Sequence, residues 1–235
     1  DALSAKAVAA APGVKALASA SHAVSYVLGV DDGEGMSDTQ ALESARSIAS
    51  AVDIPVSIDF ERGYTRNLAK LHLNITKLIQ TGAAGLNFED STGRDAQPLT
   101  PLEEQLDRIR TVRTAADDAK VPLVINARVD SLVRGGDWDD ALTRANAYLG
   151  AGASSIFFLG VRTDDEIKRA VDEIDGRVSI IAGTTSPPLP RLAELGVSRV
   201  SFGPGPLGLA LAHLQAAAAQ LTALGDYPEE LSFRY

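Results

Sequence analysis

Acidic side chains close two apolar runs in the first half of the chain, and their spacing predicts a metal site. The first run ends in Asp59, with Glu61 two residues further on, and the second ends in Glu89 and Asp90. Because side chains two apart on a strand share a face, we expect Asp59 and Glu61 to point the same way. Buried carboxylates that lack a cation are costly. A hard divalent ion, Mg²⁺ above all, is the simplest compensation, since it prefers oxygen ligands.

A second interpretation makes these acids structural, because ion pairs with Arg62 or Arg94 would also neutralise them. A later segment favours a ligand site instead. It reads Asn126-Ala-Arg-Val-Asp and places three polar side chains on one face of an apolar run. The guanidinium of Arg128 can bind a carboxylate or a phosphonate through two parallel hydrogen bonds. We therefore predict an anion site beside the metal.

Seven apolar runs, most of them rich in Val, Ile, Phe and Ala, predict the strands that position these residues. They are Val14–Ala20, Ile54–Phe60, Ala83–Glu89, Val121–Arg128, Ser154–Leu159, Val178–Ala182 and Arg199–Gly203. Helical patterns alternate with them at Ala2–Ala11, Thr39–Ala51, Thr65–Thr81, Pro101–Ala119, Trp138–Gly150, Thr163–Glu173, Pro190–Leu195 and Leu207–Leu224. The stretch between the first strand and Thr39 is predicted as a loop that carries Asp32 and Glu34. Such alternation predicts a parallel sheet covered by helices.

These units predict an α/β fold, a (β/α)₈ TIM-type barrel that forms a single domain over residues 1–235. Such a barrel has eight strands, and the chain opens in a helical pattern, so we expect the first strand to lie upstream of Asp1. An open doubly wound sheet is the competing architecture. It normally carries a glycine-rich phosphate turn after its first strand, and no G-x-G-x-x-G or Walker sequence occurs here. In a barrel, the site lies at the carboxyl ends of the strands, where the acids fall.

Charge and composition narrow the classes of function. The formal net charge is -9 at pH 7, which argues against nucleic acids and anionic membranes as partners. The chain has no cysteine, so disulfides, zinc–thiolate sites and thiol catalysis are excluded. The sequence has no signal peptide pattern and no apolar stretch long enough to span a bilayer. The cytoplasm is the expected compartment.

Six short segments, in their order along the chain, resemble the phosphoenolpyruvate mutase/isocitrate lyase superfamily. They are Asp1-Ala-Leu-Ser-Ala-Lys, Leu28-Gly-Val-Asp-Asp-Gly, Asp59-Phe-Glu-Arg-Gly-Tyr, Asn87-Phe-Glu-Asp, Asn126-Ala-Arg-Val-Asp and Val200-Ser-Phe-Gly. The resemblance covers the whole chain. It implies a (β/α)₈ barrel that forms a homo-oligomer, a dimer or a tetramer, through a C-terminal helix exchanged between subunits. It also implies 2-oxo acid chemistry, in which a bound metal stabilises the enolate formed as a bond to the adjacent carbon breaks.

The resemblance also assigns roles by position. It implies that Asp59 binds Mg²⁺ directly, and that Glu61, Glu89 and Asp32 ligate the ion mostly through water. Arg128 would bind the carboxylate or phosphonate of the substrate, which is a small 2-oxo acid or a phosphonate.

Further candidates surround this predicted metal site. Backbone amides and hydroxyls around Ser19 and Ser21 would hold the 2-oxo acid end of the substrate, and Asp59 and Arg128 complete the predicted substrate contacts. Two further side chains are candidate catalytic groups in addition to Arg128. His22 could donate a proton, although a lone histidine is more often structural. Tyr64 could donate a proton or line the pocket.

One loop departs from the family pattern. Isocitrate-type lyases of this superfamily carry a Lys-Lys/Arg-Cys-Gly-His loop after the Glu-Asp strand, and its cysteine is the catalytic acid/base. Residues 91–98 here read Ser-Thr-Gly-Arg-Asp-Ala-Gln-Pro. Cleavage of isocitrate or methylisocitrate by that route is therefore not expected. Mutase and phosphonopyruvate hydrolase members carry Lys and Asn or Thr in a longer lid loop, where this chain offers Thr92 and Arg94.

The sequence thus predicts a Mg²⁺-dependent lyase that cleaves a carbon–carbon bond of a small 2-oxo acid, as a decarboxylase or a retro-aldol lyase does. The first alternative is a mutase or hydrolase of the phosphonopyruvate type, which acts on a carbon–phosphorus bond. A second alternative is a non-catalytic protein that binds a 2-oxo acid, since the family's cysteine is missing. A third is an unrelated barrel that binds phosphate at the Gly203 loop.

Overall fold

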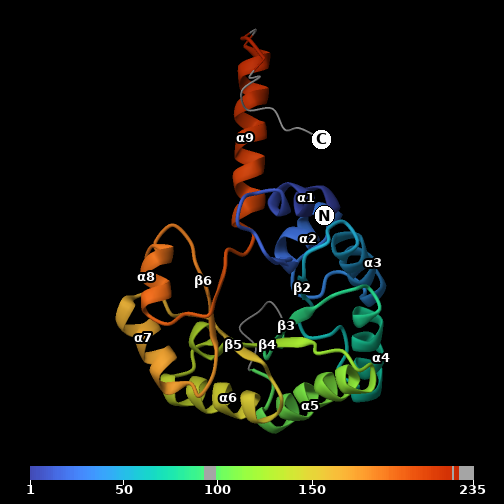
Figure 1. The fold of residues 1–235 in the computed structure, drawn as a ribbon, viewed down its shortest axis with the longest axis vertical. Helices are drawn as coiled ribbons and strands as arrows, with labels where there is room; N and C mark the ends of the chain where they lie inside the picture. Colours follow the sequence, from blue (N-terminus) through green and yellow to red (C-terminus); the bar gives the residue numbers. More distant parts are fainter. Residues whose placement is uncertain (93–98, 224, 228–235) are drawn as a thin grey trace.

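The computed structural model describes residues 1–92, 99–223 and 225–227, and a curved parallel sheet lies at its centre (Figure 1). Its strands are β1 (Leu17–Ala18), β2 (Val56–Asp59), β3 (Gly85–Glu89), β4 (Val124–Val129), β5 (Ser155–Phe158), β6 (Val178–Ile181) and β7 (Arg199–Ser201). They pair in chain order, and every pair is parallel. A doubly wound sheet would reverse this order at a switch point. Within the described residues β7 does not pair with β1, so the sheet is a nearly closed barrel.

Helices surround the strands, except for the last one, which projects away from them (Figure 1). They are α1 (Ala2–Ala9), α2 (Ser21–Leu28), α3 (Asp38–Ala49), α4 (Leu68–Ile79), α5 (Leu102–Asp118), α6 (Trp138–Gly150), α7 (Asp164–Glu173), α8 (Leu189–Glu194) and α9 (Gly205–Thr222), with a short 3₁₀ turn, η1, at Ser131–Arg134. The predicted α/β architecture of a TIM-type barrel is therefore confirmed. The strand expected upstream of Asp1 stays a prediction, and so does the single domain over residues 1–235.

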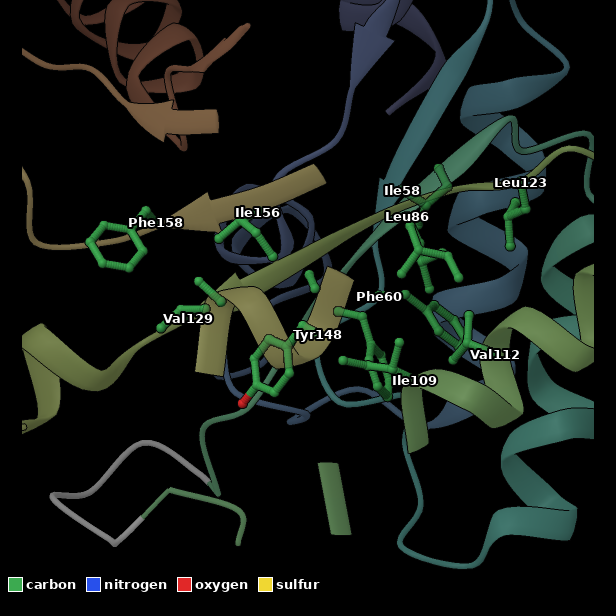
Figure 2. Packing of buried hydrophobic residues seen from close by; sticks show 14 of the residues in the cluster. Ile58, Phe60, Leu86, Ile109, Val112, Leu123, Val129, Tyr148, Ile156 and Phe158 are labelled. Carbon is green, nitrogen blue, oxygen red and sulfur yellow. The ribbon is translucent and has the colours of Figure 1, made fainter. Parts of the chain in front are cut away.

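Side chains alternate along the strands between an apolar outer face and a polar inner face. Ile58, Leu86 and Ile125 are register partners on β2, β3 and β4, and each is at most 4% exposed. All three belong to one buried cluster with Ile109 and Val112 of α5, in which Figure 2 shows Ile58 and Leu86. Burying each such side chain contributes about 1.5–3 kcal/mol. The core therefore lies between strands and helices, which leaves the inside of the barrel for polar residues.

A helix stands where the sequence predicts a loop. α2 begins at Ser21, and the strand before it shrinks from the predicted Val14–Ala20 to two residues. The N-cap of α2 is Ala20, which has no side chain that could cap a helix. The cap comes instead from Asp59, whose Oδ2 accepts a hydrogen bond from the Ser21 amide at 2.9 Å. A local pattern cannot show a cap that lies 38 residues further along the chain.

Helix α9 projects away from the barrel (Figure 1), and none of its residues is buried. Leu211, Leu214 and Leu221 are exposed and spaced so that they share one face of the helix, while Leu209 lies on another. A helix that is apolar on several faces normally packs against a partner. None of the described helices is long and apolar enough to cross a membrane. We expect a second copy of this chain to cover α9.

Replacing Leu211 and Leu214 together by Glu should dissociate the oligomer, because two charges would otherwise be buried at the contact. Sedimentation velocity of the wild-type chain and the double variant measures the change. Gln220→Glu adds a charge to the opposite side of the same helix and is the matched control, which should stay assembled. A wild-type chain that sediments as a monomer would contradict the expected contact.

Candidate functional site

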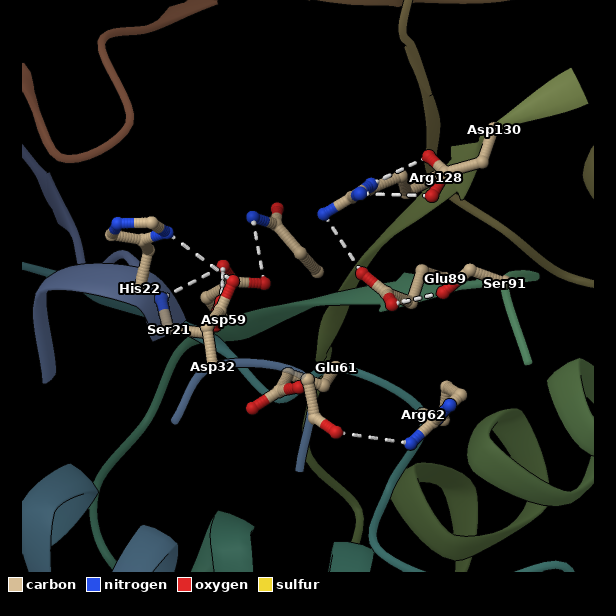
Figure 3. A network of polar contacts seen from close by, with 12 residues as sticks. Ser21, His22, Asp32, Asp59, Glu61, Arg62, Glu89, Ser91, Arg128 and Asp130 are labelled. Atoms are coloured by element: carbon tan, nitrogen blue, oxygen red, sulfur yellow. Dashed lines mark hydrogen bonds and ion pairs between the residues drawn. The ribbon is translucent and has the colours of Figure 1, made fainter. Parts of the chain in front are cut away.

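Asp59 ends β2 and lies at the centre of the candidate site (Figure 3). Its Oδ2 accepts hydrogen bonds from the amide of Ser21 at 2.9 Å and from the Ser21 hydroxyl at 2.8 Å. Its own amide donates to Oγ of Ser19 at 2.9 Å. The carboxylate thus sits at the N-terminus of α2, where free amides and the helix dipole favour a negative charge. Oδ1 has one long contact, 3.4 Å from Nδ2 of Asn87, so it can still bind a cation.

A row of inward-facing polar side chains holds Asp59 from the other side. Asp59, Asn87, Asn126 and Ser155 are register partners on β2 to β5. The Ser155 hydroxyl donates to Oδ1 of Asn126 at 2.7 Å, and Nδ2 of Asn126 donates to Oδ1 of Asn87 at 2.8 Å. Pairing these buried groups with one another removes most of the cost of burying them. The row ends at Asp59, so the inside of the barrel helps to orient that carboxylate.

Glu61 lies in the turn after β2 and not on the strand. Its φ is 46°, in the left-handed region, so the expectation that it shares a strand face with Asp59 is wrong. The turn nevertheless buries Glu61, which is 2% exposed. The Tyr64 hydroxyl donates to its Oε1 at 3.0 Å, and the amide of Glu34 donates to its Oε2 at 2.5 Å. Tyr64, a candidate proton donor, therefore contacts a predicted metal ligand.

Asp32 comes from the loop between α2 and α3. Its Oδ2 lies 3.4 Å from Nδ1 of His22, which is in the first turn of α2 and stacks edge-on against Tyr26. Its Oδ1 is buried and has no hydrogen-bond partner among the described residues. An unpaired buried acceptor is costly. This oxygen therefore indicates a ligand that the described side chains do not supply.

Arg128 and Glu89 are register partners on β4 and β3, and their side chains meet. Nη1 of Arg128 lies 2.8 Å from Oε2 of Glu89, and the Ser91 hydroxyl donates to Oε1 of the same carboxylate. Nε and Nη2 of Arg128 donate to the two carboxylate oxygens of Asp130 at 2.7 and 2.8 Å. This bidentate pair fixes the plane of the guanidinium. Nη1 and Nη2 each carry a second N–H, with which Arg128 could bind a substrate anion.

Burial, together with crowded negative charges, raises the pKa of two carboxyl groups in this site. Burial is the main reason that the pKa of Glu61 rises to about 8, and the charges of Glu89, Asp32 and Asp59 add to it. Burial likewise raises the pKa of Glu89 to about 7, against the opposing charge of Arg128. A divalent cation among these groups would relieve both the repulsion and the cost of burial.

The four predicted metal ligands come together at one end of the barrel (Figure 3). They are Asp32, Asp59, Glu61 and Glu89. Among the described residues, no three Asp, Glu or His side chains lie close enough to coordinate one ion directly. Mg²⁺ keeps several water ligands and is usually held by one or two carboxylates. The residues therefore fit a hydrated ion bound at Asp59, which the other three carboxylates would reach through water.

The structure brings the predicted site residues to the same end of the barrel, but it gives some of them unexpected partners. The hydroxyls of Ser19 and Ser21, predicted to hold the substrate, bind Asp59. Asp90 accepts hydrogen bonds from the amide of Asp130 at 3.0 Å and from the Tyr148 hydroxyl at 2.7 Å, and burial raises its pKa to about 6. A small cavity beside Asp59 is lined by Ser19, Ser21, Val24, Met36, Ala41, Ser44, Ala45, Ile48, Ile58, Asp59 and Tyr64.

Arg62 pairs with Glu34 at 2.8 Å. The interpretation that Arg62 neutralises the acids at the strand ends is therefore wrong. Arg94 lies outside the described residues. Sequence reasoning gave no role to Glu34, Asn87 or Asn126. For the two asparagines a signal existed, because each stands two residues before the residue that ends its predicted strand, Glu89 or Arg128, and so shares a strand face with it. No pattern marks Glu34 within its loop.

The raised pKa of Glu61 predicts that the metal-free protein loses stability as the pH rises. The carboxyl of an unfolded chain titrates near about 4.3. Between that pH and about 8 only the folded state keeps the proton on Glu61. This group therefore lowers the free energy of unfolding by up to about 1.4 kcal/mol per pH unit across that window.

Urea unfolding in a chelator at pH 6, 7 and 8 measures this slope. Glu61→Gln should flatten it, while Asp172→Asn, at an exposed ion pair with Lys168, should not. Added Mg²⁺ should restore stability at pH 8. An equal slope in the wild type and Glu61→Gln would show that Glu61 is not the protonated group.

The chain is similar to proteins of known sequence and structure. The family model described as phosphoenolpyruvate phosphomutase matches residues 1–222. Oxaloacetate decarboxylase of Rhodopseudomonas palustris (strain ATCC BAA-98 / CGA009) is 30% identical over 175 residues, which are 72% of this chain. The match spans 57% of the length of that relative.

Two solved structures show the same barrel. The crystal structure of an inferred phosphonomutase from Burkholderia cenocepacia J2315 is 37% identical, with a TM-score of 0.87 over 94% of this chain and 91% of that one. The structure of a phosphonopyruvate hydrolase in complex with oxalate and Mg²⁺ is 27% identical, with a TM-score of 0.82 over 97% of this chain and 81% of that one. The chain belongs to the phosphoenolpyruvate phosphomutase family, within the phosphoenolpyruvate mutase/isocitrate lyase superfamily.

Proposed function

We propose that this chain is a Mg²⁺-dependent enzyme that cleaves a carbon–carbon bond of a small 2-oxo acid, as a decarboxylase or a retro-aldol lyase does. One observation carries the proposal: buried carboxylates converge beside an arginine, where Oδ1 of Asp59 has one long hydrogen bond, from Asn87, and Oδ1 of Asp32 has no partner among the described residues. The similarity to an oxaloacetate decarboxylase supports carbon–carbon cleavage. The oxalate and Mg²⁺ in the hydrolase structure support the metal and the shape of the ligand.

Each part of the site has a task in such a reaction. When bound, Mg²⁺ would act as a Lewis acid that stabilises the enolate left when the bond breaks. Asp59, held by Ser21 and Asn87, fixes where the substrate's oxo group must lie. Arg128, held by Asp130, would bind the second anionic group of the substrate. In a decarboxylation, carbon dioxide leaves, its bonding electrons stay on the adjacent carbon, and that carbon then takes up a proton.

The proton donor stays a prediction with two candidates. The Tyr64 hydroxyl donates to Glu61, so a shift of that hydrogen bond would be needed to reach a substrate. The His22 side chain is 39% exposed and lies 3.4 Å from Asp32, which places an imidazole at the edge of the site in contact with solvent. Either group could return a proton to the enolate carbon.

A carbon–phosphorus bond is the second candidate target. The phosphonopyruvate hydrolase structure favours it, because that protein shares the barrel and binds oxalate with Mg²⁺. A guanidinium can bind a phosphonate in the same way as a carboxylate. Assays of oxaloacetate and phosphonopyruvate on the same preparation separate the two candidates. Pyruvate with carbon dioxide identifies the first reaction, and pyruvate with inorganic phosphate identifies the hydrolytic form of the second.

The proposal predicts that oxalate, a planar mimic of the pyruvate enolate, binds only together with Mg²⁺. Thermal unfolding should shift upwards by several degrees with both ligands, because ligands that bind only the folded state stabilise it. Asp59→Asn should abolish the shift, since it keeps an acceptor for Ser21 and removes the charge. Asp172→Asn is the control and should keep the full shift. A shift that is equal with and without Mg²⁺ would contradict the proposed metal site.

A further inference from the structure

The loop between α2 and α3 and the turn after β2 are joined by reciprocal contacts. The amide of Glu34 donates to Oε2 of Glu61 at 2.5 Å. In return, Oε1 of Glu34 accepts hydrogen bonds from the amides of Arg62 at 3.2 Å and Tyr64 at 2.7 Å. Oε2 of Glu34 pairs with Nη2 of Arg62 at 2.8 Å. Within the described part of the chain, the hydrogen bonds of this carboxylate thus all go to the turn that carries Glu61.

Both segments adopt backbone conformations that side chains disfavour. Among the described residues other than glycine, four have a positive φ, and three of them lie here: Glu34 at 64°, Glu61 at 46° and Tyr64 at 60°. Such residues persist only where the surrounding contacts over-determine them. The carboxylate of Glu34 supplies these contacts through charge-assisted hydrogen bonds to two amides of the turn.

The turn that Glu34 contacts is also held by an arginine of α5. Nη1 of Arg108, on α5, donates to the carbonyl of Thr65 at 2.9 Å, and its Nη2 donates to the carbonyl of Arg62. The side chains of Arg62 and Glu34 are only 18% and 17% exposed. Solvent and salt therefore screen this ion pair much less than a surface pair.

The position of Asp32 depends on this junction. Asp32 lies two residues before Glu34, and the loop between them is tightly folded. A Cβ at Gly35 would lie 2.1 Å from the carbonyl oxygen of Asp31. The backbone of this loop therefore packs closely against itself. Oδ2 of Asp32 lies 3.4 Å from Nδ1 of His22, and its buried Oδ1 has no hydrogen-bond partner in the described part of the chain. The chain itself must therefore hold Asp32 in place.

We propose that Glu34 is a positioning residue for the metal. It fastens the Asp32 loop to the Glu61 turn, so that carboxylates from two distant segments reach the same ion. Glu34 acts through its neighbours, because its own carboxylate is fully engaged by the amides and the side chain of the turn. The inference rests on the proposed function, since it requires a metal at Asp59.

Mn²⁺ titrated into the full chain and followed by electron paramagnetic resonance tests the inference without an activity assay. Glu34→Ala should weaken Mn²⁺ binding about 10–100-fold, the range for groups that orient metal ligands. Glu34→Gln should lose less, because its amide oxygen can still accept from the two backbone amides. Asp172→Ala, at an exposed pair with Lys168, is the matched control and should bind Mn²⁺ like the wild type.

A double-mutant cycle separates positioning from a merely structural role. If Glu34 acts by placing Asp32, then Asp32→Ala should weaken Mn²⁺ binding in the wild type and change it little in Glu34→Ala. Additive losses would overturn the inference, and so would a Glu34→Ala chain with wild-type affinity. Should Glu34→Ala fail to fold, Arg62→Met serves in the same cycle, because it removes the ion pair with Glu34 and the Nη2 hydrogen bond to the Gly33 carbonyl, both of which join the same two segments. A wild-type chain that binds no Mn²⁺ would overturn the proposed function as well, and the wild-type titration alone identifies that case.

Discussion

Negative charge is concentrated at one end of the barrel, and the rest of the structure has to stabilise it. Each carboxylate there has its own compensation. Asp59 sits at the start of α2, Glu89 pairs with Arg128, and Glu61 accepts hydrogen bonds from a hydroxyl and an amide. Asp32 keeps a buried oxygen that has no hydrogen-bond partner among the residues that the structure describes. These contacts leave part of the negative charge uncompensated, and a divalent cation would neutralise it, which is why the site indicates a metal.

The barrel makes this concentration of charge possible. Parallel strands in chain order bring the ends of β2, β3 and β4 to one edge. Apolar side chains stabilise the sheet from outside, so the inner face is free to carry the polar row that ends at Asp59. A doubly wound sheet would cover both faces with helices and leave no such interior. The fold and the site therefore both follow from the alternation of apolar and polar side chains along the strands.

The sequence predicts much of this arrangement, because strand ends and register follow from short-range patterns. It places Asp59, Glu89 and Arg128 correctly at the ends of neighbouring strands. It fails where one segment is stabilised by another that is distant in the chain. Helix α2 is missed because its cap is Asp59, and the conformation of Glu61 is missed because Glu34 holds its turn. Both errors fall on the site itself, where local preferences give way to long-range contacts.

Exchange of substrate protons with solvent tests the central claim most directly. Pyruvate in D₂O, with the protein and Mg²⁺, can be followed by the loss of its methyl proton signal in NMR spectra. A site that stabilises an enolate should catalyse this exchange, and the exchange should stop in a chelator and in Asp59→Asn. If oxalate binds with Mg²⁺ while no 2-oxo acid exchanges its protons or reacts, the chain is a metal-dependent binding protein and the catalytic account is wrong.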